Sequence, residues 1–391
     1  MDKPIPLARP ELGSREEELV LEVLRSGSLS LGPALSKFET TFASWLGSDD
    51  AVAVSSGTAG LHLGVRRLGW GEGDEVLTTP FSFVASSNCL LYEGVKPVFC
   101  DIDPITLNID PAAADAAAGE RTAGILPVHI FGYPADLIAL ERIADAREVP
   151  ILEDACQALG AVDGEGRAIG TAGHVATFAF YANKQMTTGE GGVVVPAGEE
   201  MAEWLRSERN QGRSQNRAAV EHDRIGFNYR MSDIQAAIGI AQLERLDQLL
   251  ERRASVASLY ADRLAGLGAA DPADGNGEAL LLPCADRGDE RRSWFVYPVQ
   301  LPGDADRAGV IEVLDAEGIR SKAYMPCIHT LPHYREHFGF KGGEYPVAER
   351  VADRSLALPF FGSMTESQVD RVCTALARAL NLEPGSRASP G

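Results

Sequence analysis

Residues Ala176–Val195 read ATFAFYANKQMTTGEGGVVV and join two predicted strands. The apolar runs Ala176–Phe180 and Gly192–Val195 are typical of buried strands. Lys184 lies in the connection between them. An ammonium at such a place is partly desolvated, which lowers its pKa and leaves a neutral amine free for Schiff-base chemistry. A lysine in a loop is more often a solvated surface charge, so this stretch alone leaves both interpretations open.

A carboxylate follows another predicted strand upstream. Residues Pro150–Gln157 read PILEDACQ, a short apolar run that ends in Glu153 and Asp154. In open α/β sheets, ligands bind at the carboxyl ends of the strands. A lysine and an aspartate at two strand ends suggest pyridoxal phosphate, because the lysine can carry this cofactor while the aspartate pairs with its pyridinium nitrogen. A structural salt bridge would use the same residue types, so this pair stays ambiguous at this point.

A small, hydroxyl-rich turn follows the first predicted strand. Residues Ser55–Leu63 read SSGTAGLHL and open a helix. Backbone N–H groups at a helix start, together with a hydroxyl, can bind a phosphate. Many strand-to-helix turns are equally small, so the motif gains weight only beside Asp154 and Lys184. The three features occur in the chain order that one cofactor would need.

Two aromatic residues and a histidine are further candidates for the cofactor pocket. Phe81 and Phe83, in PFSFVAS after the second predicted strand, could stack on a flat ring, although aromatic side chains are more often part of the core. His129 ends the fourth strand. It could line the pocket, but a buried histidine with satisfied hydrogen bonds is an equally good interpretation.

The order of apolar runs predicts an α/β fold. Seven short runs are expected to be strands, in a mostly parallel sheet covered by helices on both faces. The strands are expected at 51–55, 75–79, 97–101, 124–128, 150–154, 176–180 and 192–195, and helices between them at 61–68, 82–92, 111–118 and 137–147. We expect a large domain at 1–250, a smaller α+β domain at 251–382 and a disordered tail at 383–391.

Two capping boxes mark predicted helix starts. Ser14 with Glu17 begins the first helix, which Gly27 can end. Ser232 with Gln235 begins a long helical pattern that continues to about residue 267.

Composition excludes several classes of protein. The 391 residues carry a formal net charge of -20, which argues against a nucleic-acid partner. The six cysteines show no metal-type or paired spacing, so we expect reduced core thiols and no metal site. No segment approaches the roughly 18 apolar residues of a membrane span, and the first residues lack an apolar signal. We therefore expect a cytoplasmic protein without a membrane partner.

Ordered motifs across the chain resemble one known family. Over about Leu7 to Leu380 the chain resembles the sugar aminotransferases of the DegT/DnrJ/EryC1/StrS group. The resemblance implies a fold-type-I pyridoxal-phosphate transferase with the aspartate-aminotransferase fold. The motifs that carry it are SSGTAGLHL, GDEVLTTPFSFVAS, PVFCDIDPITLNID, PVHIFGYPADL, ILEDACQALGA, FYANKQMTTGEGG, GFNYRMSDIQAAIGIAQL and HTLPHYRE.

The resemblance assigns the cofactor site residue by residue. It makes Lys184 the lysine that carries the cofactor and Asp154 the pyridinium partner. Gln157 falls beside the ring hydroxyl, and Gly57 with Thr58 contact the phosphate.

Three further positions follow from the same resemblance. Phe83 falls at the ring-stacking position. Asn228 falls where the family reaches the neighbouring subunit's phosphate, which implies a homodimer with shared active sites. Ala179 departs from the pattern, because many members have a phosphate-binding serine there; a water or Thr58 could replace it.

The implied substrate is a nucleotide-linked keto sugar, with L-glutamate as amino donor and 2-oxoglutarate as its product. His329 lies where the family places a residue near the sugar. Both substrates are anionic, and Arg230 belongs to a set of arginines that could bind them or form an ordinary solvated face. A keto-cyclitol aminotransferase and a cofactor-bound regulator without turnover are the alternatives. The other arginines of the set are Arg206, Arg209, Arg213, Arg217 and Arg224.

Overall fold

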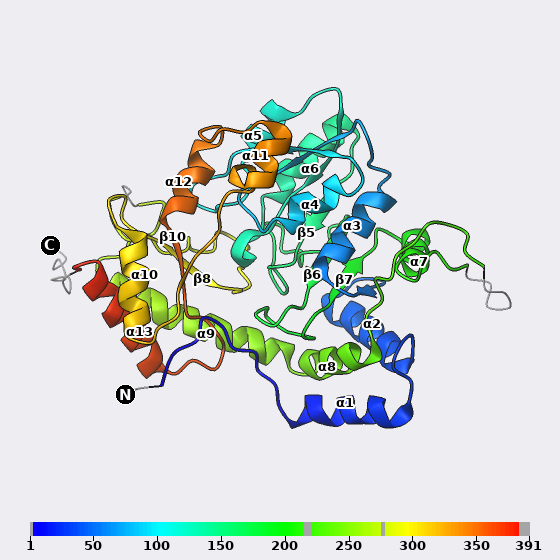
Figure 1. The fold of residues 1–391 in the computed structure, drawn as a ribbon, viewed down its shortest axis with the longest axis horizontal. Coiled ribbons are helices and arrows are strands. Elements are labelled where there is room, and N and C mark those ends of the chain that lie inside the picture. The colour runs from blue at the N-terminus through cyan, green and yellow to red at the C-terminus, as the bar shows by residue number, and fades with distance from the viewer. Residues whose placement is uncertain (1–2, 215–220, 275–277, 383–391) are drawn as a thin grey trace.

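The computed structural model describes residues 3–214, 221–274 and 278–382. The first part of the chain forms two neighbouring sheets (Figure 1). Their strand orders are β1-β7-β6-β5 and β3-β2-β4. The strands are β1 Val52–Val54, β2 Glu75–Thr78, β3 Lys96–Phe99, β4 Thr122–Leu126, β5 Leu152–Asp154, β6 Val175–Ala179 and β7 Gly192–Val195.

The expected strands are present, but the expected single sheet of seven is divided into these sheets of four and three. Their edges adjoin at β4 and β5, where two isolated parallel bridges, Ile125–Ile151 and Val128–Asp154, connect them. Pro127 and Pro150 lie in the two edge segments and accept hydrogen bonds through their carbonyl oxygens. Because proline has no N–H to donate, a continuous ladder cannot form there.

Strand β7 runs against the direction of its neighbours. β2 is parallel to β3 and β4, and β5 is parallel to β6, whereas β7 pairs antiparallel with both β1 and β6. Antiparallel neighbours need no crossover helix between them. The residues between β6 and β7 therefore form a compact turn at the strand ends, and Lys184 lies in it as the sequence predicts.

Helices cover both faces of the β1-β7-β6-β5 sheet. Alternate residues of β7 enter different apolar clusters: Val194 packs with α3 and α7, whereas Val193 and Val195 pack with α2 and α8. This alternation follows from the two-residue period of a strand. The helices of this part are α2 Pro33–Leu46, α3 Gly57–Arg67, α4 Ala85–Leu91, α5 Pro111–Ala117, α6 Leu137–Arg147, α7 Glu199–Glu208 and α8 Asp233–Leu243.

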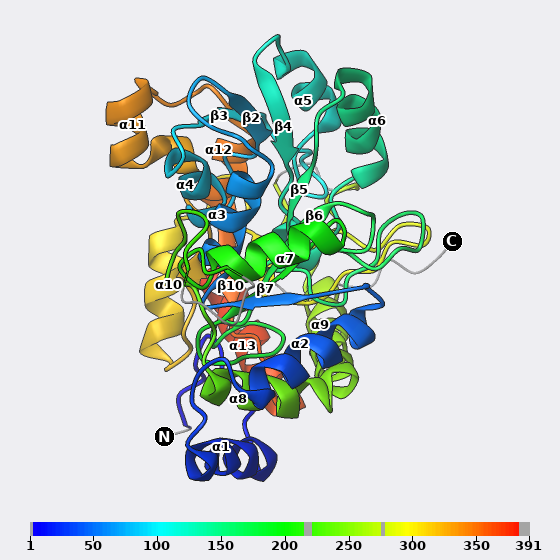
Figure 2. The ribbon, with the colours of Figure 1, turned by 90° about the vertical axis from the view of Figure 1, so that its right-hand side faces the viewer.

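Helix α1 (Ser14–Ser26) packs on α8 at the edge of the molecule (Figure 2). Its predicted start was wrong by one residue. Gly13 is the N-cap, and its N–H donates to the carboxylate of Glu16 at 2.8 Å. Nε2 of Gln242 donates to the same buried carboxylate at 2.6 Å, which fixes Glu16 at this helix start. The predicted end at Gly27 and the capping box of Ser232 with Gln235 at α8 are confirmed.

Helix α9 (Leu246–Ala265) connects the two parts of the molecule (Figure 1). It starts after a break at Glu244 and Arg245, so the predicted long helix is two helices. The chain after α9 forms a small antiparallel sheet in the order β8-β10-β9. The elements of this part are β8 Tyr297–Gln300, α10 Arg307–Ala316, β9 Lys322–Ala323, α11 Pro332–Phe338, α12 Pro346–Arg354, β10 Ser355–Leu358 and α13 Glu366–Ala379, with a 3₁₀ turn at Ile328–Thr330. A further 3₁₀ turn, Ile130–Gly132, lies in the first part of the chain, between β4 and α6.

The expected domain boundary at residue 250 falls inside α9. Leu246 and Leu250 pack in the apolar cluster of α2, α8 and β7, whereas Val256 and Tyr260 pack with the small antiparallel sheet. The division into domains stays a prediction, and the expected tail at 383–391 lies outside the described residues. None of the helices described is long and apolar enough to cross a membrane.

We expect Gly60→Ala to destabilise the protein, although alanine is the better helix former. An ideal Cβ at Gly60 would lie 2.6 Å from Cγ2 of Thr177 and 3.1 Å from Cγ2 of Val194, so α3 must move away from the sheet. Such overpacking costs about 1–3 kcal/mol. Urea unfolding measures this change. Gly119→Ala, where no atom lies within 4 Å of the added Cβ, is the control; equal stability of the two variants would contradict close packing of α3.

Candidate active site

Lys184 lies at the centre of the candidate site, in the turn between β6 and β7. Its backbone N–H donates to the carbonyl oxygen of Tyr181 at 3.0 Å, and its Nζ lies 3.9 Å from the centre of the Phe295 ring. Lys184 keeps some exposed surface, but protein atoms crowd its ammonium, and this desolvation lowers the pKa of Lys184. The negative charge of Asp154 opposes the shift. The amine is thus favoured in its neutral, nucleophilic form.

Asp154 ends β5 and is a buried carboxylate held by uncharged donors. It is 4% exposed, its Oδ2 accepts from Oγ of Ser86 at 2.6 Å, and its Oδ1 accepts from the N–H of Cys156 at 3.1 Å. Among the residues that the structure describes, no cation forms an ion pair with Asp154, and this includes Lys184. The alternative of a structural salt bridge is therefore wrong, and the carboxylate can accept a cationic N–H from a ligand.

The turn after β1 brings its backbone close to both strand ends. Gly57 begins α3, and an ideal Cβ there would lie 2.7 Å from Cβ of Ala179 and 2.8 Å from Sγ of Cys156, so no larger residue fits. Ser56 caps the helix, since its Oγ accepts from the N–H of Ala59 at 3.1 Å. The partly exposed Thr58 follows. Backbone N–H groups in this first helical turn have no partner within the helix and can bind an anion.

Gln157 connects Asp154 to the lysine turn. Its Oε1 accepts from the N–H of Phe131 at 3.0 Å, and its carbonyl oxygen accepts from Nε2 of Gln185 at 2.7 Å. Since Gln185 directly follows Lys184, this hydrogen bond holds the lysine turn against the segment after β5. No motif in the sequence indicated this role for Gln185.

The structure separates the aromatic candidates. Phe83 is 64% exposed, whereas Phe81 is fully buried and contacts Phe131 edge to face. Phe81 is thus a core residue, and Phe83 keeps a free ring for stacking. His129 is fully buried, and both of its ring nitrogens have partners. Its Nε2 lies 3.0 Å from Oε2 of Glu153, and its Nδ1 accepts from the N–H of Ala135 at 3.0 Å. It is the satisfied buried histidine of the alternative interpretation.

Asn228 lies in a packed segment beside the turn that begins α3. Phe227 and Tyr229 stack on each other with ring centres 4.9 Å apart, and Asn228 between them is exposed. The carbonyl oxygen of Tyr229 accepts from the N–H of Ser55 at 2.8 Å, so the segment lies next to the end of β1. Arg230 follows and donates to Oδ1 of Asn210 at 3.1 Å.

Two arginines of the predicted set pair with carboxylates of the scaffold. Arg206 pairs with Asp50 at 2.6 Å, and Arg209 pairs with the buried Glu39. These arginines fasten the end of α7 to β1 and the residue before it, because the guanidinium of Arg206 also donates to the carbonyl oxygen of Ala51 and that of Arg209 to the carbonyl oxygen of Ala53. Arg217 lies outside the described residues.

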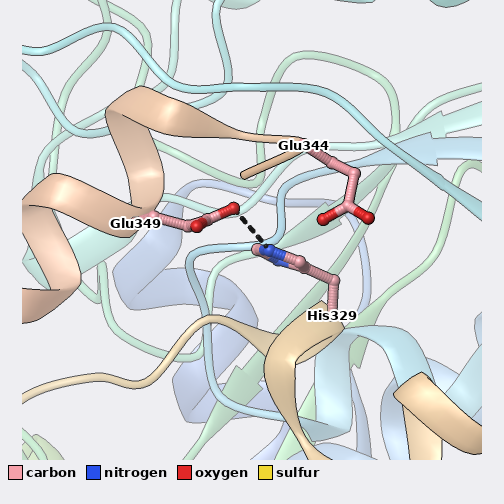
Figure 3. A group of neighbouring side chains, drawn as sticks. All are labelled: His329, Glu344 and Glu349. Atoms are coloured by element: carbon pink, nitrogen blue, oxygen red, sulfur yellow. Dashed lines mark hydrogen bonds and ion pairs between the residues drawn. The ribbon is translucent and has the colours of Figure 1, made fainter. Parts of the chain in front are cut away.

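His329 lies in a cluster with Glu344 and Glu349 (Figure 3). It is fully buried, and its Nε2 lies 3.0 Å from Oε1 of Glu349. Ligand-type atoms of the three residues lie within 4.8 Å of one another. Backbone N–H groups of residues 341–345 already donate to both carboxylates, at 2.7–3.2 Å. We therefore assign the cluster to the structure of this loop, and the role of His329 near the sugar stays a prediction.

The described residues fit pyridoxal phosphate. Asp154 offers a buried carboxylate held by uncharged donors, the Gly57 turn offers backbone N–H groups at a position that excludes side chains, and Lys184 offers an amine of lowered pKa. The sequence did not reveal the roles of Ser86 or Phe295. Ser86 ends the motif PFSFVAS, but nothing in that motif shows that its hydroxyl reaches Asp154, and Phe295 lies outside the quoted motifs. Each reaches the site only through contacts across more than sixty positions of the chain.

Comparisons with known proteins find relatives over nearly the whole chain. The chain is 36% identical to GDP-perosamine synthase of Caulobacter vibrioides over 380 residues, covering 96% of this chain and 98% of the relative. It is 35% identical to the spore coat polysaccharide biosynthesis protein SpsC of Bacillus subtilis, covering 95% and 96%. The solved structure of DesV from S. venezuelae matches with a TM-score of 0.88 at 33% identity, covering 98% of this chain and all of DesV.

The family model for these enzymes matches residues 10–377, nearly the whole chain. With the lysine, the buried aspartate and the glycine turn in one site, the chain belongs to the DegT/DnrJ/EryC1/StrS aminotransferase family and is a pyridoxal-phosphate-dependent aminotransferase.

Proposed function

We propose that this enzyme moves the amino group of L-glutamate to the carbonyl carbon of a nucleotide-linked keto sugar, giving 2-oxoglutarate and an amino sugar. The observation that carries the proposal is the separation of Lys184 from Asp154: both side chains are withdrawn from water, yet they form no ion pair with each other. A group with an electrophilic carbon and a basic ring nitrogen would satisfy both. Pyridoxal phosphate, when bound, supplies a reactive carbonyl and an electron sink.

Each side chain has a separate task in this proposal. The neutral amine of Lys184 binds the cofactor covalently and, once released, takes the proton from the α-carbon of the donor. Asp154 accepts the ring N–H, and Ser86 holds the carboxylate in place at 2.6 Å. Gly57 and Thr58 bind the phosphate through their N–H groups, Phe83 covers the ring, and Gln157 lies beside the ring hydroxyl.

Two observations support the substrate class. One relative is named for a GDP-linked product, and the matched relatives span the same length as this chain. The protein carries a net charge of -20, so anionic substrates need local cations or N–H donors at the site. We propose that Arg230 and His329 contact the substrate, with the exposed Arg213 and Arg224 nearby in the chain. Turnover with a panel of nucleotide-linked keto sugars tests this, with a keto-cyclitol as the competing substrate.

We also propose a homodimer in which Asn228 completes the partner's phosphate site. Asn228 is exposed while its neighbours Phe227 and Tyr229 stack and pack against His62 of α3. This packing turns the amide away from its own domain. An exposed polar side chain on a fixed segment suits contact with a second chain.

Lys184→Ala should abolish the covalent attachment of the cofactor and the yellow colour of the protein. The reason is that no other described lysine combines a strand-end position with a pKa lowered by burial. Borohydride reduction followed by peptide mass spectrometry measures the attachment. Lys37→Ala, which removes an exposed lysine of α2, should change nothing. A cofactor found on a different lysine would refute the assignment.

Asp154→Asn should keep the cofactor but slow the glutamate half-reaction by about 10²–10⁴-fold, or roughly 3–5 kcal/mol at ~1.4 kcal/mol per tenfold. An amide cannot stabilise the protonated ring nitrogen. Stopped-flow absorbance gives the rate. Asp145→Asn, on the exposed side of α6, serves as the control. A rate near that of the unmodified protein would make Asp154 structural.

Co-expression of two inactive chains tests the shared site. A heterodimer of Lys184→Ala with Asn228→Ala should hold one site with both lesions and one intact site, so activity recovers. Lys184→Ala with Asp154→Asn is the control, because both residues belong to one chain and every site keeps one lesion. Differently tagged chains allow the heterodimers to be isolated and assayed. Equal activity of the two combinations would refute a shared site.

A further inference from the structure

Arg253 of α9 is a buried cation directly behind the lysine turn. It is 5% exposed, and its Nη2 donates to the carbonyl oxygens of Asn183 at 3.2 Å and Lys184 at 2.9 Å. Its Nη1 is buried without a hydrogen-bond partner. Within the described part of the chain, no carboxylate forms an ion pair with it. Burying a charge without an ionic partner costs free energy, so we looked for a role of Arg253 that this cost could serve.

The surroundings leave Arg253 charged but poorly compensated. Its guanidinium lies 5.4 Å from the centre of the Phe360 ring. The negative charge of Glu11 raises the pKa of Arg253, but the Glu11 carboxylate forms its ion pair with the neighbouring Arg252, at 3.0 Å. Burial lowers the pKa of Arg253 to about 10, which still leaves the guanidinium protonated at neutral pH.

The charge of Arg253 acts on the amine of Lys184. Desolvation is the largest cause of the lowered pKa of Lys184, and repulsion from Arg253 lowers it further. Asp154 of β5 and Cys156 after it act in the opposite sense. A buried cation disfavours the protonated form of a neighbouring amine, so the charge of Arg253 adds to the effect of desolvation. A lysine activated by a second cation is an established route to a nucleophilic amine.

We propose that Arg253 is a positioning residue for Lys184, which fixes the lysine turn through two carbonyl hydrogen bonds and favours the neutral amine through its buried charge. The role deepens the proposed function, since a neutral amine is what the lysine needs to bind the cofactor and to take a proton. Arg253 itself touches no reacting atom. It acts from the opposite side of the turn, through the backbone and the electric field.

Two variants separate the charge from the hydrogen bonds. Arg253→Gln keeps an N–H donor for the carbonyl oxygens but removes the charge. Arg253→Lys keeps the charge and a donor on a side chain of similar length. If the field of Arg253 matters, only the glutamine variant will change the amine; if the residue is only a clamp, both variants will behave alike.

The experiment labels the cofactor-free protein with acetic anhydride, which reacts with neutral amines, over a range of pH. Peptide mass spectrometry gives the labelling midpoint of Lys184, with the exposed Lys37 as the internal reference. The midpoint does not depend on how accessible the amine is. We expect Arg253→Gln to raise it, so that labelling at pH 8 falls about three- to tenfold, or roughly half to one pKa unit. Arg253→Lys should stay within about twofold of the unmodified protein.

Arg252→Gln is the matched control, because it removes a neighbouring charge that is exposed and already paired with Glu11. An unchanged midpoint in Arg253→Gln, or equal shifts in the glutamine and lysine variants, would overturn the proposal. If Arg253→Gln does not fold, Arg253→Met gives the same charge removal with an apolar chain of similar length. Since no cofactor is present, the outcome is independent of whether Lys184 binds pyridoxal phosphate.

Discussion

The site depends on desolvation of charges that the protein does not pair with each other. Lys184 and Asp154 emerge from neighbouring strands, and an ion pair between them would be the least costly arrangement in a buried site. The fold prevents this, because Asp154 is held by the hydroxyl of Ser86 and the N–H of Cys156, and Lys184 rests on the Phe295 ring. The cost of two unpaired charges is what a bound cofactor can recover.

The sheet supplies the rigidity that this arrangement needs. Because β7 runs antiparallel to β6, the chain returns to the sheet without a crossover helix, and the lysine turn lies at the end of these two strands. Proline in the edge segments of β4 and β5 interrupts the ladder there, yet bridges on both sides keep the edge of β5 in register and Asp154 in place. The glycine at position 57 then allows α3 to begin almost in contact with β6.

Long-range contacts hold the loops around the site. Gln185 fastens the lysine turn to Gln157, and the stacked Phe227 and Tyr229 fasten the Asn228 segment to α3. α9 contributes Arg253 from the far side of the turn, while its other end packs with the small antiparallel sheet. A movement of that sheet relative to the strands would therefore act on the lysine turn through α9. The pairing of Arg206 and Arg209 with carboxylates makes those cations part of the scaffold.

The sequence alone determined the strands, most of the helices, the position of Lys184 between two of them and Asp154 at a strand end, since periodicity and strand-end residues are local properties of the chain. It also indicated the glycine turn. It did not determine the division of the sheet, because the missing proline N–H groups matter only where two edges meet. Tertiary structure decided that Phe81 is core and Phe83 exposed, that His129 is satisfied by Glu153, and that Ser86, Phe295 and Arg253 act on the site. The contacts of Ser86, Phe295 and Arg253 join residues about seventy or more positions apart, and only the packed chain brings these groups within reach of one another.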